Sequence, residues 1–218
     1  MPPVVPLSIG ELRARYGTQL ADGFELVKWP VYHFQTYAAA GQTSLTFFNA
    51  VGTDKDLNNM EANASFPAPK KYFVRSLGIH LKPPTAVSIS AATAGTAVHA
   101  RLNDVEGVFN SGHLEFNIGN KQYMFGAPLG LFPTPIVFDG FAGTHFTQAA
   151  AADRQLTHGI LQNSKNHRDG FLLDPPLFIE SQINWTLETR WTTAVTISVV
   201  ATNGFGVILL GQLIRPMQ

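Results

Sequence analysis

Apolar and polar residues alternate along most of this chain with the two-residue period of a β-strand. The alternating segments are rich in aromatic and β-branched residues, and groups of Gly, Pro, Asn and Asp separate them, as at Gly119–Asn120 and Asp174–Pro176. Many short strands separated by turns predict an all-β antiparallel sandwich or barrel. The predicted strands are Phe24–Gln35, Ser44–Val51, Tyr72–Leu81, Ala86–Ser90, Thr96–Leu102, His113–Ile118, Gln122–Phe125, Phe178–Leu187, Ala194–Val200 and Phe205–Ile214.

The N-terminal residues 1–20 depart from this pattern. Ser8 and Glu11 have the spacing of a capping box, which predicts a short helix that includes Leu12. We interpret residues 1–20 as an arm and residues 21–218 as one domain, because sandwiches of this length often fold as single domains.

Residues 126–170 interrupt the series of strands. They begin with a Pro- and Gly-rich apolar loop, and the Ala-rich segment Thr147–Leu156 that follows predicts a helix. Long ordered loops are uncommon unless they serve a function. This excursion either contacts a neighbouring subunit, with Leu129, Leu131 and Phe132 as the contact residues, or caps its own sandwich.

Asn203–Gly204 is a strong hairpin signal between the last two predicted strands. A two-residue loop there fixes which residues share a face. It places Val195, Ile197, Val199, Ile208 and Leu210 in the core. The opposite face then carries Phe205, Val207 and Leu209, so we expect the N-terminal arm or an adjacent subunit to cover these three residues.

Composition narrows the possible functions. Hydrophobic residues make up 45% of the chain and charged residues only 14%, against a usual share of about 25%. We therefore expect part of the surface to be buried against partners. The 15 Lys and Arg residues balance 15 Asp and Glu residues, which argues against autonomous nucleic-acid binding.

The absence of cysteine excludes disulfides, thiolate catalysis and Cys-based zinc sites. Residues 1–6 lack the features of a secretory signal, so we expect synthesis and retention in a cytoplasm. The uncharged stretch from Trp191 to Ile214 exceeds the ~20 residues of a membrane helix, but its alternation predicts strands instead.

Candidate catalytic and metal-binding residues are few. His113 and Glu115 lie two apart on a predicted strand, as metal ligands of cupins do, yet Ser111 stands where a further His is needed. Asp104 and Glu106 have the types of a carboxylate pair but more closely resemble a polar turn. We therefore predict no catalytic residue, metal or cofactor.

Three tryptophans, Trp29, Trp185 and Trp191, raise the alternative of a carbohydrate-binding, lectin-like module, since aromatic faces stack on sugars. Alternation places Trp185 with Ile183 and Leu187, which predicts core packing. The position of Trp29, next to Pro30, stays open.

Three segments resemble major capsid proteins of tailless icosahedral viruses, especially the jelly-roll coats of membrane-containing bacteriophages. They are Asn58–Lys70 leading into Tyr72–Ile79, Leu173–Ile179 leading into Gln182–Leu187, and the terminal Gly211–Gln218. Coats with two jelly rolls in one chain are usually longer, so this chain fits a single jelly roll.

The resemblance implies a self-assembling structural subunit of a virion, assembled in the host cytoplasm. Its partners would be copies of itself in trimers or hexamers, other capsid proteins and an internal viral membrane, with no specific nucleic acid. Loops of residues 127–170 and the arm of residues 1–20 would join subunits. The interface residues that we predict from the excursion, the hairpin and the arm are Leu12, Leu129, Leu131, Phe132, Phe205, Val207 and Leu209.

Overall fold

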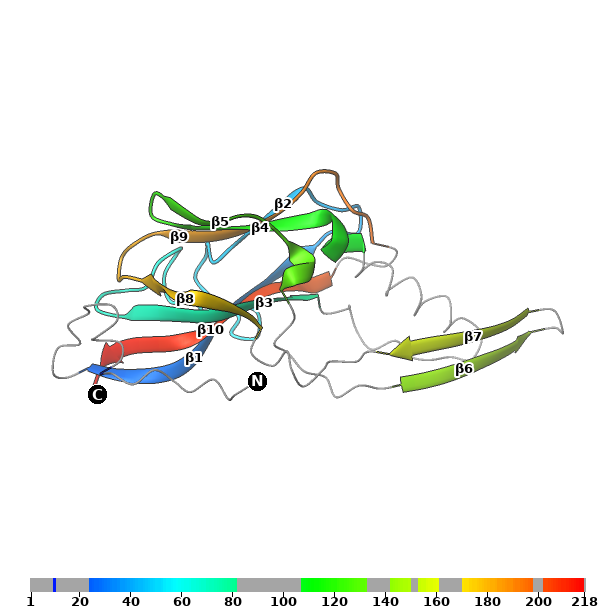
Figure 1. The fold of residues 1–218 in the computed structure, drawn as a ribbon, viewed down its shortest axis with the longest axis horizontal. Coiled ribbons are helices and arrows are strands. Elements are labelled where there is room, and N and C mark those ends of the chain that lie inside the picture. Colours follow the sequence, from blue (N-terminus) through cyan, green and yellow to red (C-terminus); the bar gives the residue numbers. More distant parts are fainter. Residues whose placement is uncertain are drawn as a thin grey trace.

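Two antiparallel four-stranded sheets face each other and enclose the core (Figure 1). The computed structural model describes Gly10 and residues 24–81, 107–132, 142–149, 153–160, 170–197 and 202–217, with the backbone alone at 142–149, 153–160 and 202–203. Sheet A has the order β1 (Phe24–Tyr37), β10 (Thr202–Pro216), β3 (Lys71–Leu81) and β8 (Phe171–Ile179). Sheet B has the order β2 (Ser44–Phe47), β9 (Trp185–Trp191), β4 (Gly112–Ile118) and β5 (Lys121–Pro128).

The chain crosses repeatedly between the two sheets. Strands β1 to β4 alternate between sheet A and sheet B, β5 pairs with β4, and β8 to β10 alternate again. This strand order is that of a jelly roll. The predicted all-β antiparallel sandwich is therefore confirmed, and helical structure in the described part of the chain is limited to Gly10, residues 107–111 and the 3-10 helix η1 (Leu129–Leu131).

Period-two alternation builds both walls of the core. In β4 and β9 every second residue is buried, from Leu114 and Phe116 to Trp185 and Leu187. Aromatic rings fill the space between the sheets. Phe205 of sheet A lies 5.5 Å from Trp191 of sheet B, measured between ring centroids. Trp185 was predicted as a core residue, and this is confirmed.

The predicted hairpin at Asn203–Gly204 is wrong. Both residues lie within β10, whose neighbours are β1 and β3. Residues 192–197 form no strand, and Ile197 instead donates a backbone hydrogen bond to Ala39. Because β10 is a central strand, pairing with two distant strands outweighs the local turn preference.

The facing predicted for the last strand is reversed, whereas Ile197 is a core residue and Val195 packs against the core, as predicted. Phe205, Val207 and Leu209 point into the core between the sheets and are fully buried. Ile208, which was assigned to the core, lies on the outer face of sheet A opposite Tyr32. A one-residue change of register exchanges the two faces of a strand, which explains the reversal.

The helix predicted over Thr147–Leu156 is also wrong. The backbone there belongs to a two-stranded hairpin of β6 (Ala142–Ala149) and β7 (Asp153–Ile160). This hairpin pairs with neither four-stranded sheet and stands apart from them in Figure 1. Helix propensity is a weak preference, and cross-strand pairing, for example of Phe146 with Leu156, overrides it.

Several boundaries also differ from the predictions; the strand predicted over Ser44–Val51, for example, ends at Phe47. Phe178–Leu187 was predicted as one strand, but β8 ends at Ile179 and β9 begins at Trp185. Asp174–Pro176, predicted as a separator, lies inside β8. The turn at Gly119–Asn120 is confirmed between β4 and β5. The predicted strands Ala86–Ser90 and Thr96–Leu102, and the N-terminal helix apart from Gly10, lie outside the described residues.

Among the described residues, no helix has the length and apolar character needed to cross a membrane.

Candidate interaction surfaces

The outer face of sheet B is polar and carries a small charge network. Arg190 of β9 lies 3.4 Å from Glu115 of β4 and 2.8 Å from Glu188 on its own strand, measured between nitrogen and carboxylate oxygen. His113 lies 3.6 Å from Glu115. The predicted His113–Glu115 pair thus forms, with an arginine as an additional partner of the carboxylate.

A search for metal-binding clusters in the described ranges finds no group of three or more His, Cys, Asp or Glu residues suited to a metal. Asp104 and Glu106 lie outside the described residues, and so does the arm residue Leu12.

Each of the four sheet edges has a feature that disfavours pairing with a further strand. In sheet A, β1 contains Pro30, and β8 contains the cis Pro175 followed by Pro176. In sheet B, β2 has only 4 residues, and β5 shows two register irregularities against β4 with Gly126 at φ +64°. Proline, short length and bulges are the devices by which proteins protect sheet edges.

Five exposed apolar side chains lie on η1 and on two edge strands, β5 of sheet B and the start of β8 of sheet A. The most exposed is Phe125, at 83%. A ring contact of 5.1 Å between Phe132 and Phe171 joins the segment after η1 to β8. We name this surface the β5–β8 band; its residues are Tyr123, Phe125, Leu131, Phe171 and Leu172, which are all exposed.

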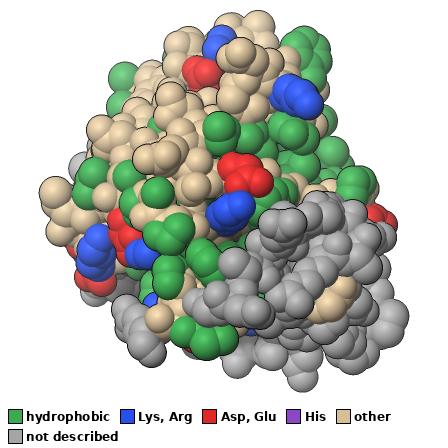
Figure 2. Space-filling model, turned by 90° about the vertical axis from the view of Figure 1, so that its left-hand side faces the viewer, with side chains coloured by type: hydrophobic (Ala, Val, Ile, Leu, Met, Phe, Trp, Pro, Cys, Tyr) green, Lys and Arg blue, Asp and Glu red, His purple; other side chains and the backbone are tan. Residues whose placement is uncertain are grey.

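The chain as a whole carries few charged side chains. Charged residues form 14% of the chain. One end of the molecule shows a few Lys, Arg, Asp and Glu side chains dispersed among apolar and uncharged surface (Figure 2).

The predicted interface residues divide between the core and the β5–β8 band. Leu131 is exposed in the band, whereas Leu129 and Phe132 are buried beneath it. Phe205 and its neighbours Val207 and Leu209 are core residues, as described above, so the expectation that something covers them from outside is wrong.

Sequence reasoning missed most of the band. Tyr123 and Phe125 stand two apart on a predicted strand, which is a signal for one shared apolar face. Whether that face points to the core or to solvent depends on the register with β4, and the bulges that set this register have no evident sequence signature.

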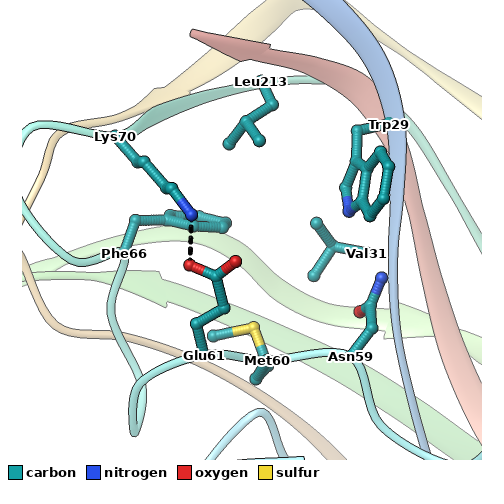
Figure 3. Close-up of a pocket in the computed structure, with 8 residues that line it drawn as sticks. All are labelled: Trp29, Val31, Asn59, Met60, Glu61, Phe66, Lys70 and Leu213. Carbon is teal, nitrogen blue, oxygen red and sulfur yellow. Dashed lines mark hydrogen bonds and ion pairs between the residues drawn. The ribbon is translucent and has the colours of Figure 1, made fainter. Parts of the chain in front are cut away.

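A hollow opens beside β1, and we name it the Trp29 hollow (Figure 3). It is a shallow depression that opens to solvent and encloses only about 20 Å³. Lys70 and Glu61 form an ion pair of 2.5 Å on one side, and Trp29 stands on the other. The lining residues are Trp29, Val31, Asn59, Met60, Glu61, Phe66, Lys70 and Leu213.

Hydrogen bonds fix the strand that carries Trp29. Asn59 donates from Nδ2 to the Pro30 carbonyl at 2.8 Å and accepts at Oδ1 from the Tyr32 backbone N–H at 2.9 Å. The buried Tyr72 hydroxyl donates to the Trp29 carbonyl at 2.6 Å, and burial raises the pKa of Tyr72.

Next to this strand segment, His33 is a buried base on the inner face of β1. Its Nδ1 accepts the Phe48 backbone N–H at 2.7 Å, so the ring is held with an unprotonated Nδ1. Burial lowers the pKa of His33 from 6.5 to about 4. His33 therefore contributes to folding as a neutral ring, and its low exposure speaks for a structural role.

Comparison of the chain with protein-family models, with curated proteins and with solved structures finds no match.

Proposed function

We propose that this chain is the structural subunit of an icosahedral viral capsid and that its copies associate laterally through the β5–β8 band. The observation that carries the proposal is the exposed band itself, with Phe125 at 83% and Leu131 at 53%, on a sandwich whose four edges are protected. The jelly-roll strand order supports it, since viral coats are one of the main uses of that fold.

Protected edges and an exposed side surface together favour closed assemblies. Strand pairing at a free edge can continue without limit, whereas a discrete side-chain patch repeated by rotation closes into a ring. Exposed apolar patches of this kind mark protein contacts on otherwise soluble domains. A trimer or hexamer is the expected capsomer, and repetition of modest contacts over a shell supplies the stability.

Further partners follow from the same proposal. Balanced charges, 15 basic and 15 acidic residues, suit a shell that neither condenses a genome nor recognises a nucleic-acid sequence. We propose that other capsid proteins and an internal viral membrane lie next to this shell, that the arm with Leu12 joins subunits, and that assembly takes place in the host cytoplasm before incorporation into the virion.

Association as a function of concentration tests the proposal. We expect size-exclusion chromatography with light scattering, followed by electron microscopy, to reveal trimers or hexamers of the full chain. Phe125→Asp and Leu131→Asp each place a charge in the band and should shift the protein toward monomers. The control Val51→Asp changes a residue of similar exposure (48%) outside the band and should leave association unchanged.

A chain that stays monomeric at all concentrations, salts and pH values would contradict the capsid proposal. Equal disruption by Val51→Asp would instead contradict the role of the band. Thermal unfolding of each variant by circular dichroism verifies that a loss of association is not a loss of fold.

A further inference from the structure

We infer that the Trp29 hollow binds one pyranose ring of a neutral saccharide. This inference is independent of the proposed assembly, because none of the lining residues belongs to the β5–β8 band. It rests on three features of the hollow, namely an exposed aromatic wall, a donor and an acceptor placed side by side, and a rigid support.

The aromatic wall is built around Trp29. Its side chain is 45% exposed, whereas Trp185 and Trp191 are 1% and 3% exposed in the core. Trp29 stands on the side of the hollow opposite Lys70, and Phe66 lies beneath the Lys70 amine (Figure 3). The C–H face of a pyranose is apolar and flat, so it packs against such rings while its hydroxyls stay at the edge.

The polar side of the hollow matches a pair of neighbouring hydroxyls. Lys70 bonds Oε2 of Glu61, which leaves Oε1 as an acceptor and two further N–H groups of Lys70 as donors. Of two vicinal hydroxyls, one accepts from the ammonium and the other donates to the carboxylate. The ion pair has no net charge, so it favours a neutral ring over an anionic or cationic one.

The support of the hollow is held before any ligand arrives. Asn59 and Tyr72 fix the backbone of β1 at Trp29 and directly after it through the bonds described above. Phe66 stacks on Tyr72 with ring centroids 5.3 Å apart and an interplanar angle of 25°. A site whose walls are already ordered loses little conformational entropy on binding.

The size of the hollow limits the ligand. The hollow is shallow and open to solvent, so it can cover only one face of a single ring, with the other face and any further sugar residues in solvent. With one stacked ring and one hydroxyl pair, we expect a dissociation constant in the millimolar range.

Tryptophan fluorescence is the direct test, because the two core tryptophans provide a constant background and Trp29 provides the responsive signal. The full chain is titrated with D-glucose, D-galactose, D-mannose and N-acetyl-D-glucosamine. At least one sugar should give a saturable change that disappears in Trp29→Ala. The control Phe125→Ala removes an exposed aromatic residue elsewhere and should retain the response.

Lys70→Met tests the polar half of the site and keeps the aromatic wall. Binding measured by saturation-transfer NMR should weaken at least tenfold in this variant. Because Lys70 is partly exposed, we expect Lys70→Met to fold. This variant therefore tests saccharide binding even if Trp29→Ala is unstable. The inference is overturned if none of the four sugars gives a saturable response, or if Lys70→Met binds as tightly as the unmodified chain.

Discussion

The outer faces of the two sheets differ sharply. On strands β4 and β9 of sheet B the outward residues are polar, and Glu115, Glu188 and Arg190 form a solvated charge network. On sheet A, Phe73 and Ile214 are buried on the outward side and form a second apolar cluster. The cluster also includes the partly buried Phe24, Leu26 and Phe178.

This difference shows how one strand can be apolar on both faces within a single chain. On the inner side of β10, Phe205, Val207 and Leu209 belong to the main core. On its outer side, Ile208 and Ile214 are also buried. Antiparallel sheets usually leave one face to solvent, as sheet B does. In sheet A the central strands β3 and β10 are buried on both faces, whereas the edge strands β1 and β8 include exposed residues. The residues of the β5–β8 band lie on the edge strands β5 and β8 and on η1.

The main core is the more costly of the two clusters to disturb. Phe205 is fully buried and contacts Tyr37, Phe47 and Trp191 at centroid distances of 5.5 to 5.9 Å. Phe205→Ala should lower the free energy of unfolding by about 3–5 kcal/mol, because it removes the ring and leaves a cavity between two sheets that cannot close.

Urea denaturation monitored by fluorescence gives this value, and Phe178→Ala in the outer cluster is the matched control. Phe178 is only partly buried, so its loss should cost clearly less than that of Phe205. Equal losses would mean that the outer cluster contributes as much as the main core.

The buried His33 makes the stability of the main core depend on pH. The pKa of His33 is about 4 in the folded chain and about 6.5 when unfolded, so the unfolded state binds a proton first as pH falls. The contribution of neutral His33 to the free energy of unfolding is fully present above pH 6.5. It is lost as pH falls from 6.5 to 4, by about 3 kcal/mol in total.

Unfolding free energies measured at several pH values between 4 and 7 test this effect. His33→Gln offers an acceptor to the Phe48 N–H without titrating, so its stability should fall less over the same interval. The carboxylates are common to both proteins and cancel in the difference. Identical pH profiles would rule out a proton-linked contribution of His33.

A matched pair of exchanges compares the outer faces directly. Ile214→Thr puts a hydroxyl into the outer cluster of sheet A, where Ile214 is 3% exposed, and should cost about 1–3 kcal/mol. Thr186→Val, on the outer face of sheet B, should change stability by less than about 0.5 kcal/mol. Thermal unfolding of both variants gives the comparison, and similar costs would mean that the two faces are equivalent.

Local sequence patterns predicted much of the sandwich, because alternation and turn residues act over a few positions. The strand at His113–Ile118 and the turn at Gly119–Asn120 were predicted and are present. The same local reasoning failed at Asn203–Gly204, where the partners of β10 are β1 and β3, far away in sequence. The order of strands depends on such distant pairings, which one sequence does not reveal.

The candidate surfaces were less predictable than the fold. Leu131 was identified, but Phe125 was not, because exposure depends on the bulges between β4 and β5. The Trp29 hollow joins β1 to residues 59–70, and its ion pair brings together Glu61 and Lys70 across a loop. Residue types alone raised an aromatic sugar platform as an alternative and predicted Trp185 as a core residue, and of the three tryptophans the structure leaves only Trp29 exposed.

The smallest effect is expected on the solvated face of sheet B. Arg190 is about half exposed, so its bonds to Glu115 and Glu188 compete with water and are screened by salt. Arg190→Gln should lower stability by less than about 1 kcal/mol at low salt. Raising the salt concentration should shrink this difference, while the costs of Phe205→Ala and Ile214→Thr stay as they are. Urea denaturation of the three variants at low and high salt measures how the stability loss of each variant depends on salt. A large, salt-independent cost at Arg190 would mean that this face is covered like the outer face of sheet A, and the contrast between the sheets would be lost.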